Sequence, residues 1–428
     1  MKIPRRLRRV KFRPAAQHTT SFAGLRFVFD LAVKLGVIQD LRTLTVKKRR
    51  RGIPIEDFVM GLASNFLVGG DSLTDLQVLR DETVTRALCY GLEVPAPTTA
   101  GERLRTFTLG HLYQLERIHR HGAHTILRHT GGSGPMTVDL DSSIFEVHGY
   151  LKEGARYGYT GERGLHPLLA FAHGERLLLD ARLRAGNRAS ADGVESFLPQ
   201  VLKAIPAERG PRFRMDAGFY AQGVERFCVA RRLGFSITAK LTSRLQAAID
   251  ALPASAWGPY PWEDDAEWAA FRYRPRGWSR AYRLLVKRAP WYEKDQRILG
   301  EYFYTTCITN VAGAGSSLIR YHLARGGMEN YIEEFKHGLG AAHLPSQSFH
   351  ANWAWLLIAG LAYNLAQAFK LLLLPSDQHA AQLKKLRLHW LNVAARWIRT
   401  QRRWILALAR GPDVVAAFSR VQTLLATL

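Results

Sequence analysis

Met136-Thr-Val-Asp-Leu-Asp141 is the stretch that decides the fold, because apolar and polar side chains alternate along it. Successive side chains of a β-strand point to opposite faces, so the alternation predicts a strand with one buried and one polar face. The polar face carries two carboxylates, Asp139 and Asp141. Gly131-Gly-Ser-Gly-Pro135, directly before the strand, is typical of a break between structural regions. A new domain is therefore expected to begin here.

The chain that follows alternates between strand-like and helix-like patterns. Short apolar runs predict strands, and longer segments with apolar residues at helical spacing predict helices. In order, we expect strands at Leu168–Phe171 and Leu177–Asp180, a helix from Gly193 to Ile205, a strand at Phe213–Asp216, a helix from Gln222 to Leu233 and a strand at Phe235–Thr238. This order predicts a mixed α/β sheet with the topology of a ribonuclease H-like fold.

Residues 252–300 interrupt this order. Several tryptophans and alternating stretches such as Phe271-Arg-Tyr-Arg274 predict a β-rich insertion. A strand resumes from Tyr302 to Ile308, and a long helix is expected from near Ser316 to beyond Lys336. From Phe22 to about Arg128, and again after Ser346, the pattern is helical.

The charge of the chain points to a polyanionic partner. Its 60 Lys and Arg residues outnumber 36 Asp and Glu, giving a formal net charge of +24, and nucleic acid is the leading candidate. A basic run between two amphipathic segments is a candidate phosphate-contacting loop, the alternative being an ordinary solvated loop. This run consists of Lys47, Lys48, Arg49, Arg50 and Arg51.

The predicted organisation is an α/β, ribonuclease H-like catalytic core with a β-rich insertion, flanked by helical N- and C-terminal regions. We expect a helical DNA-binding or dimerisation region at 1–130, the first part of the core at 131–251, the insertion at 252–300, the second part of the core at 301–345 and a C-terminal helical region at 346–428.

The compartment predicted from the sequence is the cytoplasm. Three scattered cysteines are too few for a disulfide framework or a Cys-ligated zinc, and the basic start lacks the apolar stretch of a secretory signal. The apolar segment from Ala351 to Leu374 is long enough to span a membrane. It carries amides and a lysine, which are costly in hydrocarbon, so we expect a buried helix and no membrane contact.

Three acidic residues are expected to meet at one edge of the sheet. Asp141 ends the first strand, Asp216 ends the fourth, and Glu329 lies on the helix after the resumed strand. Neighbouring strand ends lie about 5 Å apart, so two aspartates can share a metal ion. Carboxylates suit hard ions, and two such ions can drive phosphodiester chemistry. We expect these three residues to be catalytic and to bind two Mg²⁺ or Mn²⁺ ions.

Each of these assignments has an alternative. An Asp at a strand end is often only a turn or helix cap. Asp139 shares a face with Asp141 and stays open as a metal ligand. Glu333 shares the helix face of Glu329 and stays open as the third carboxylate, with Glu334 as a further rival.

The chain resembles the DDE transposases of bacterial insertion sequences with a Tyr-Arg-Glu-Lys signature. In that signature Arg precedes Glu by four positions and Lys follows it by seven, as Arg325, Glu329 and Lys336 do. Tyr321 lies one residue further from Arg325 than in the commonest pattern. Further stretches are similar to the first- and second-strand motifs and to the insertion-sequence 1380 group: Asp141-Ser-Ser143, Arg214-Met-Asp-Ala-Gly-Phe219, His148-Gly-Tyr150, Tyr157-Gly-Tyr-Thr160, His166-Pro-Leu168 and Ala351-Asn-Trp-Ala-Trp355.

The resemblance implies a cut-and-paste DNA transposase. Such an enzyme cleaves at terminal inverted repeats and transfers the freed 3′-hydroxyl ends to target DNA, and its partners are double-stranded DNA and a second copy in a homodimeric synaptic complex. Arg325, Lys336 and Tyr321 are expected to contact DNA. The insertion could hold a flipped base against Trp278 or Trp291.

Two other functions stay open. One is a sequence-specific DNA-binding protein without catalysis, which metal-dependent nicking would exclude. The other is a ribonuclease H-like nuclease that cuts without joining, which strand-transfer products would exclude.

Overall fold

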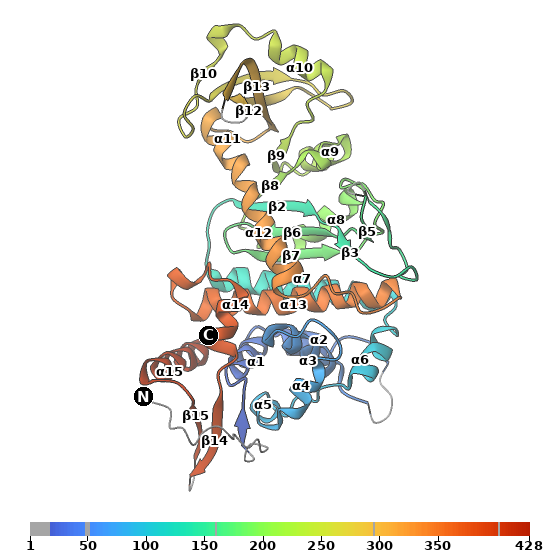
Figure 1. Cartoon of the computed structure of the whole chain (residues 1–428), viewed down its shortest axis with the longest axis vertical. Helices are drawn as coiled ribbons and strands as arrows, with labels where there is room; N and C mark the ends of the chain where they lie inside the picture. Colours follow the sequence, from blue (N-terminus) through green and yellow to red (C-terminus); the bar gives the residue numbers. More distant parts are fainter. Residues whose placement is uncertain (1–17, 48–51, 159–160, 294–295, 401–402) are drawn as a thin grey trace.

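A nine-stranded mixed sheet runs through the protein in a computed structural model that describes residues 18–47, 52–158, 161–293, 296–400 and 403–428. The strand order is β10-β11-β12-β13-β9-β8-β2-β6-β7. Helices cover the β2, β6 and β7 part of the sheet, and the insertion forms the opposite end of the molecule (Figure 1).

The five strands next to the catalytic candidates follow the order predicted from the sequence. They are β2 (Met136–Ser142), β6 (Leu168–Ala172), β7 (Leu177–Arg182), β8 (Pro211–Met215) and β9 (Gly234–Thr238). β2, β6 and β7 form an antiparallel meander, whereas β2, β8 and β9 run parallel. The parallel connections are made by α8 (Val194–Val201) and α9 (Gln222–Ala230). The predicted alternation of strands and helices is therefore confirmed.

The chain between β2 and β6 forms a small three-stranded sheet, which the sequence did not predict. It consists of β3 (Phe145–Glu146), β4 (Arg156–Tyr157) and β5 (Arg163–Leu165). These strands have only two or three residues each. Such short pairs give too little alternation to be recognised in a sequence.

The β-rich insertion is present, but it extends the main sheet. It contains α10 (Ser243–Asp250), β10 (Gly258–Pro259), β11 (Glu267–Tyr273), β12 (Tyr282–Glu293) and β13 (Gln296–Thr309). The last three residues of β13 pair with β9, beginning with Cys307 opposite Thr238. β13 also crosses residue 300, where the sequence suggested a boundary, because one long hairpin strand serves both the insertion and the sheet.

The long helix expected from near Ser316 is a run of three different helical segments. α11 (Gly315–Leu323) is followed by a 3₁₀ turn (Ala324–Gly326), by α12 (Gly327–Glu333) and by a π turn (Glu334–Gly338). The 3₁₀ turn ends at Gly326, and α12 begins at Gly327; glycine favours the α-helix only weakly. The spacing of residues in an ideal α-helix therefore does not show whether Arg325 and Lys336 lie on the same face.

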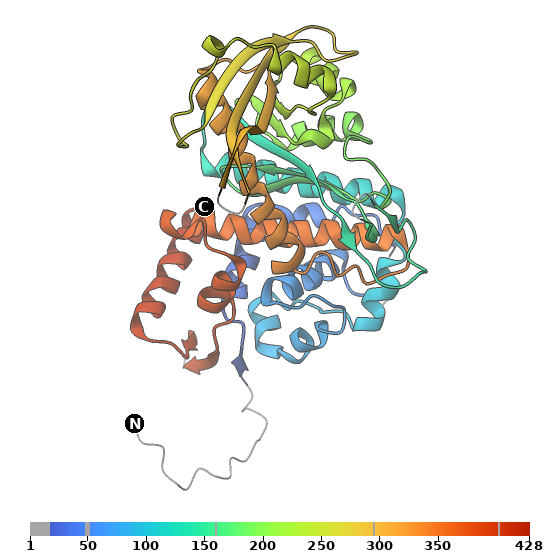
Figure 2. The same ribbon diagram turned by 45° about the horizontal axis from the view of Figure 1, so that its top comes forward.

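The region before β2 is helical, as predicted. It contains α1 (Leu25–Lys34), α2 (Val37–Leu41), α3 (Ile55–Val68), α4 (Leu76–Asp81), α5 (Thr83–Leu88), α6 (Pro97–Leu104) and α7 (Leu109–Thr130). α7 lies against the sheet, and the shorter helices lie beyond it, as both ribbon views show (Figures 1 and 2).

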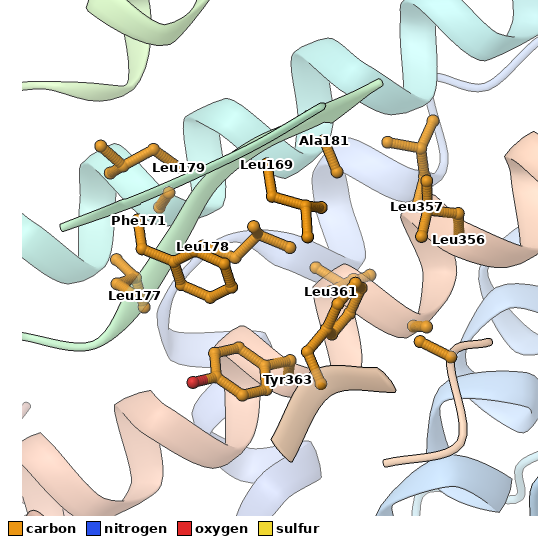
Figure 3. Close-up of a cluster of buried hydrophobic side chains, with 14 of the residues drawn as sticks. Leu169, Phe171, Leu177, Leu178, Leu179, Ala181, Leu356, Leu357, Leu361 and Tyr363 are labelled. Atoms are coloured by element: carbon orange, nitrogen blue, oxygen red, sulfur yellow. The ribbon is translucent and has the colours of Figure 1, made fainter. Parts of the chain in front are cut away.

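α13 (Phe349–Leu373) is the central helix of the protein. It packs on α3, α7 and β7, and its leucines and Tyr363 interlock with apolar side chains of β6 and β7 (Figure 3). α13 is long and apolar enough to cross a membrane, but 89% of its most apolar window is buried inside the protein. The prediction of a buried helix is confirmed.

The C-terminal region is not wholly helical, so that prediction is wrong for part of it. After α13 come α14 (Leu383–Leu386), a π turn (Arg387–Leu391), β14 (Ala395–Thr400), β15 (Arg403–Leu408) and α15 (Pro412–Thr427). β14 pairs with β15 and with β1 (Thr19–Thr20). Trp397, Ile398, Trp404 and Ile405 explain the difference, since aromatic and β-branched residues favour strands.

We predict that Asn364→Leu destabilises the fold strongly. β7 is an edge strand, and the Asn364 amide serves both backbone groups of Leu178: Oδ1 accepts from Leu178 N at 2.9 Å and Nδ2 donates to Leu178 O at 2.7 Å. Leucine would leave two buried polar groups unpaired, at about 2–5 kcal/mol in total. Urea unfolding measures the loss. Asn330→Leu at an exposed position is the control, and equal stability of the two variants would refute the prediction.

Candidate active site

Asp141 and Asp216 lie at the carboxyl ends of two adjacent parallel strands. Leu140 of β2 pairs with Met215 of β8, and each is followed directly by the aspartate. Neighbouring strands are about 4.8 Å apart. The two carboxylates therefore stand side by side at one edge of the sheet, as the sequence predicted.

The local sequence explains how Asp216 is oriented. β8 ends at Met215, and a 3₁₀ turn (Ala217–Phe219) begins at once. Asp216 Oδ1 accepts from Gly218 N at 2.9 Å, so the residue is also a cap, as the alternative interpretation held. A Cβ at Gly218 would lie 2.7 Å from Ser190 Cβ, so only glycine allows this turn.

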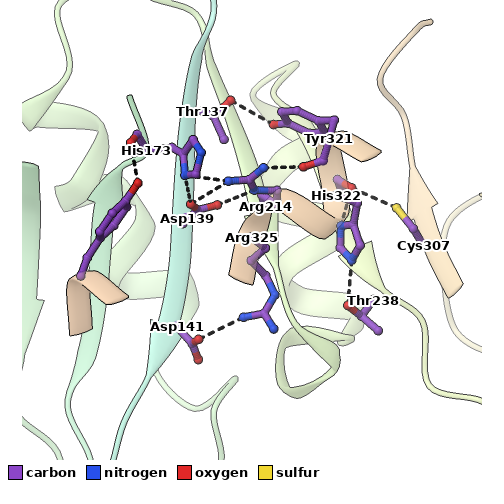
Figure 4. A network of polar contacts seen from close by, with 12 residues as sticks. Thr137, Asp139, Asp141, His173, Arg214, Thr238, Cys307, Tyr321, His322 and Arg325 are labelled. Atoms are coloured by element: carbon purple, nitrogen blue, oxygen red, sulfur yellow. Dashed lines mark hydrogen bonds and ion pairs between the residues drawn. The ribbon is translucent and has the colours of Figure 1, made fainter. Parts of the chain in front are cut away.

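Negative charge gathers around Asp141, whose side chain is 13% exposed. Burial and the charge of Asp216 raise the pKa of Asp141 to about 6, and the charge of Glu329 adds to the rise. The Ser142 backbone N–H and Arg325 act in the opposite direction. Arg325 Nη1 lies 3.1 Å from Asp141 Oδ2 (Figure 4). The charges of Asp216 and Glu329 thus act on Asp141, and Arg325 opposes them.

The rival glutamates Glu333 and Glu334 are not among the charges that act on Asp141. Glu333 is exposed, and Glu334 Oε1 accepts from Leu383 N at 2.6 Å, which ties it to α14. Glu329 is exposed as well, but it is the helix glutamate whose charge raises the pKa of Asp141.

The residues suit a divalent cation by their chemistry. Three carboxylates offer the hard oxygen ligands that Mg²⁺ and Mn²⁺ take. A buried carboxylate repelled by two others, such as Asp141, is a group whose charge a cation would stabilise. In the described ranges, no three His, Cys, Asp or Glu side chains are gathered closely enough to form a coordination shell.

Asp139 is engaged in a buried ion pair. Its two oxygens receive Arg214 Nε at 2.6 Å and Arg214 Nη2 at 2.8 Å, and His173 Nδ1 lies 2.8 Å from Oδ2. The side chains of Asp139 and Arg214 are 0% and 1% exposed. Because both oxygens are used, Asp139 has a structural role, and Asp141 is the better first carboxylate.

Tyr321 belongs to the same network. Its carbonyl accepts from Arg214 Nη1, its ring centre lies 5.0 Å from the Arg214 guanidinium carbon, and Thr137 Oγ1 donates to its hydroxyl at 3.3 Å (Figure 4). These contacts hold α11 on β2 and β8, and the expectation that Tyr321 contacts DNA stays a prediction.

His322 was not anticipated from the sequence. Its Nδ1 lies 2.8 Å from Ser236 Oγ and its Nε2 lies 2.8 Å from Thr238 Oγ1, so both ring nitrogens bind β9. Burial, together with the charges of Arg325 and Arg214, lowers the pKa of His322 to about 3. A pattern search could not find this contact, because the partners lie 84 and 86 residues away.

The two tryptophan candidates for base stacking differ in exposure. Trp278 is 3% exposed and packs against Tyr220, Phe235 and Tyr282. It is a core residue, so its stacking assignment is wrong. Trp291 of β12 is 45% exposed, and its ring centre lies 6.4 Å from that of Phe303.

The basic candidates are only partly described. Lys336 Nζ lies 5.8 Å from the Phe145 ring centre. The Lys336 side chain also lines a cavity of about 670 Å³, together with Lys152, His148 and His337. Lys47 is exposed. Residues 48–51, the rest of the predicted phosphate-contacting run, lie outside the described residues.

Comparisons with known proteins identify a family for the chain. The family model described as "Transposase DDE domain group 1" matches residues 4–428. No curated protein matches the sequence. A solved structure described as "Cryo-EM structure of piggyBac transposase synaptic complex with hairpin DNA" is similar with a TM-score of 0.45 and 10% identity, covering 96% of this chain and 84% of that chain.

We predict that Arg214→Met costs about 3–5 kcal/mol of stability, because it leaves the Asp139 carboxylate buried without its main partner. The double variant Asp139→Leu/Arg214→Met should cost clearly less than the sum of the two single variants, since no charge is then left unpaired. Urea unfolding of all three variants measures this cycle. Additive costs would mean that the pair is not coupled.

We also predict a pH-dependent stability contribution from His322. Its folded-state pKa of about 3 lies below the unfolded value of 6.5, so the unfolded state takes up the proton first. Stability should fall as pH decreases from about 6.5 towards 3, by about 2 kcal/mol at pH 5. Unfolding of the native protein and His322→Gln at pH 7 and pH 5 isolates this part. The variant should lose less stability between the two pH values, and an identical loss would contradict the assignment.

Proposed function

The chain belongs to the DDE transposase family, and on that premise we propose that it is a cut-and-paste transposase whose Asp141, Asp216 and Glu329 bind two divalent metal ions. The observation that supports the proposal is the placement of Asp141 and Asp216 at adjacent strand ends, where the charges of Asp216 and Glu329 raise the pKa of Asp141. In the proposed reaction, water cleaves the DNA at terminal inverted repeats, and the freed 3′-hydroxyl ends then attack target DNA.

The strand order supports a ribonuclease H-like core. The sequence β7-β6-β2-β8-β9, with an antiparallel meander on one side of β2 and parallel strands on the other, is the order expected for that fold. We assign 131–251 and 301–345 to this core, 252–300 to its insertion, and 1–130 and 346–428 to flanking regions. Asp141 and Asp216 then occupy its two central strands.

Members of the family generally use divalent metal ions. Two such ions supply an activated oxygen nucleophile and stabilise the leaving oxygen of a phosphodiester. The residues that would hold them are Asp141, Asp216 and Glu329. The raised pKa of Asp141 means that its surroundings disfavour the charged carboxylate, so a nearby positive charge would stabilise it.

Arg325 provides such a charge in the protein alone, through its ion pair with Asp141. We propose that in the DNA complex Arg325 binds a phosphate oxygen next to the reacting bond, since guanidinium groups match phosphate geometry. Lys336 is proposed to contact DNA further along the helical run. This assignment follows the Tyr-Arg-Glu-Lys pattern of the insertion-sequence 1380 group, with Tyr321 as its structural member.

Trp291 is the proposed base-stacking residue, because its indole is 45% exposed on the long β12–β13 hairpin. Base stacking on an exposed indole is worth about 1–3 kcal/mol. The run from Lys47 to Arg51 is proposed to bind phosphates, in keeping with the net charge of +24. Synapsis of two DNA ends requires two active sites, so we propose a homodimer that acts on DNA in the cytoplasm.

We predict that Glu329→Gln abolishes DNA cleavage while DNA binding persists. The assay uses Mg²⁺ or Mn²⁺ and duplex DNA carrying the repeats that flank the gene. Loss of a metal ligand should reduce the rate by more than the roughly 10–100-fold seen when a supporting residue is lost. Asp141→Asn and Asp216→Asn should behave alike. Glu333→Gln, on an exposed residue of the same helix, is the matched control and should cleave normally.

The variants also distinguish the competing functions. A rise in melting temperature with Mn²⁺ that is present in the native protein and absent in Glu329→Gln would support a metal site independently of activity. If Glu333→Gln fails and Glu329→Gln cleaves, the third carboxylate is misassigned. If the native protein binds but does not cut, it is a DNA-binding protein. Cutting without strand-transfer products indicates a nuclease.

A further inference from the structure

A two-stranded ribbon near the C-terminus presents one face wholly to solvent. β14 and β15 pair with Arg396 opposite Ala407, Ile398 opposite Ile405, and Thr400 opposite Arg403. All six of these side chains are exposed, and Ile398 and Ile405 are 37% and 47% exposed. We call this set the outer face of the ribbon. It holds an apolar cross-strand pair with an arginine at either end.

The other face of the ribbon packs partly against the protein: Trp397 is half-buried, whereas Trp404 is 55% exposed. Trp397 and Trp404 pack together with ring centres 4.4 Å apart, and these two residues line a cavity of about 440 Å³ with Phe27 and Phe418. The Arg399 guanidinium carbon lies 5.5 Å from the Trp404 ring centre on this side. The inner face therefore anchors the ribbon, which leaves the outer face without a packing role.

The segment of sequence that contains the ribbon is strongly basic. Between residues 378 and 412 there are eight Lys and Arg residues and no Asp or Glu. β1 pairs with β14, Thr19 opposite Arg396. Polyanions would therefore be attracted to this end of the molecule.

The ribbon also has the dimensions of a DNA-binding element. The major groove of duplex DNA is about 12 Å wide and admits a two-stranded β-ribbon. Arg396 and Arg403 are four strand positions apart, about 13 Å at 3.3 Å per residue. Arginines at this spacing can reach the phosphates on both sides of the groove, while the isoleucine pair between them faces the base edges, where it can contact thymine methyl groups.

We propose that the outer face of the β14–β15 ribbon binds double-stranded DNA through the major groove, at a site separate from the three carboxylates. The ribbon projects at the end of the molecule opposite to the insertion strands β10 to β13 (Figures 1 and 2). It would therefore hold a part of the duplex away from the bond that is cut. The inference rests on the proposed function only in that the DNA is taken to be that of the element's ends.

The test is DNA binding by the full chain in EDTA, with duplex DNA carrying the flanking repeats as the probe. Arg396→Ala/Arg403→Ala should bind at least tenfold more weakly, and its log affinity should depend less on log salt, by a slope of about 1.8 for two lost phosphate contacts. Arg399→Ala/Arg420→Ala removes the same charge from positions off the outer face and is the matched control. Arg396→Lys/Arg403→Lys should restore most of the binding, since lysine keeps the phosphate charge.

The outcomes separate the possible roles of this surface. Equal binding by the native protein and Arg396→Ala/Arg403→Ala overturns the proposal, and so does equal weakening in the control, which would indicate a general charge effect. A changed oligomeric state in light scattering with unchanged DNA binding would mean that a second copy of the chain covers the face. Circular dichroism of each variant checks that it is folded like the native protein. Because EDTA prevents metal-dependent cleavage, this result stands whether or not the native protein cuts DNA.

Discussion

The buried ion pair between Asp139 and Arg214 is the interaction on which the rest of the site depends. Arg214 extends from β8, Asp139 from β2, and the guanidinium also donates to the carbonyl of Tyr321 on α11. One side chain thus joins two central strands and the helical run that carries Arg325 and Glu329. Buried charges are costly unless they are paired and hydrogen-bonded. This requirement permits few arrangements of the three elements, and it fixes Asp141 and Asp216 two residues further along the same strands.

The site combines rigidity with unbalanced charge. Asp139 is fully satisfied, whereas the pKa of Asp141, two residues on, is raised to about 6 by burial and by the charges of Asp216 and Glu329. An arrangement of this kind lowers the stability of the protein alone and favours any cation that enters. Arg325 partly offsets the charge through its contact with Asp141 at 3.1 Å. Its guanidinium therefore lies next to a proposed metal ligand, from where it can exchange that carboxylate for a phosphate.

The order of the five strands and the positions of the two strand-end aspartates could be predicted from the sequence. Both follow from the local alternation of apolar and polar residues in segments such as Met136–Asp141. It could not decide between Asp139 and Asp141. That choice depends on Arg214, which is 75 residues away from Asp139 in the chain. Trp278 and Trp291 were equally plausible for the same reason: exposure is set by partners distant in sequence, Tyr220 and Phe235 in the case of Trp278. The hairpin in the expected helical C-terminal region was missed because basic residues interrupt its apolar pattern.

The ribbon and the catalytic helical run are connected through the short α14 segment. Glu334, in the π turn that ends this run, accepts from the Leu383 backbone N–H at 2.6 Å. Arg387, after α14, donates to Gly338 O at 2.8 Å and to Phe66 O and Leu67 O at 2.7 and 3.0 Å. These bonds involve backbone groups, so they constrain the path of the chain itself. β14 begins eight residues after Arg387. A duplex held by the ribbon would therefore have a defined position relative to Glu329, although the two surfaces lie apart. Binding at a remote surface can in this way help to orient the reacting phosphate, because fixed geometry lowers the entropic cost of the reaction.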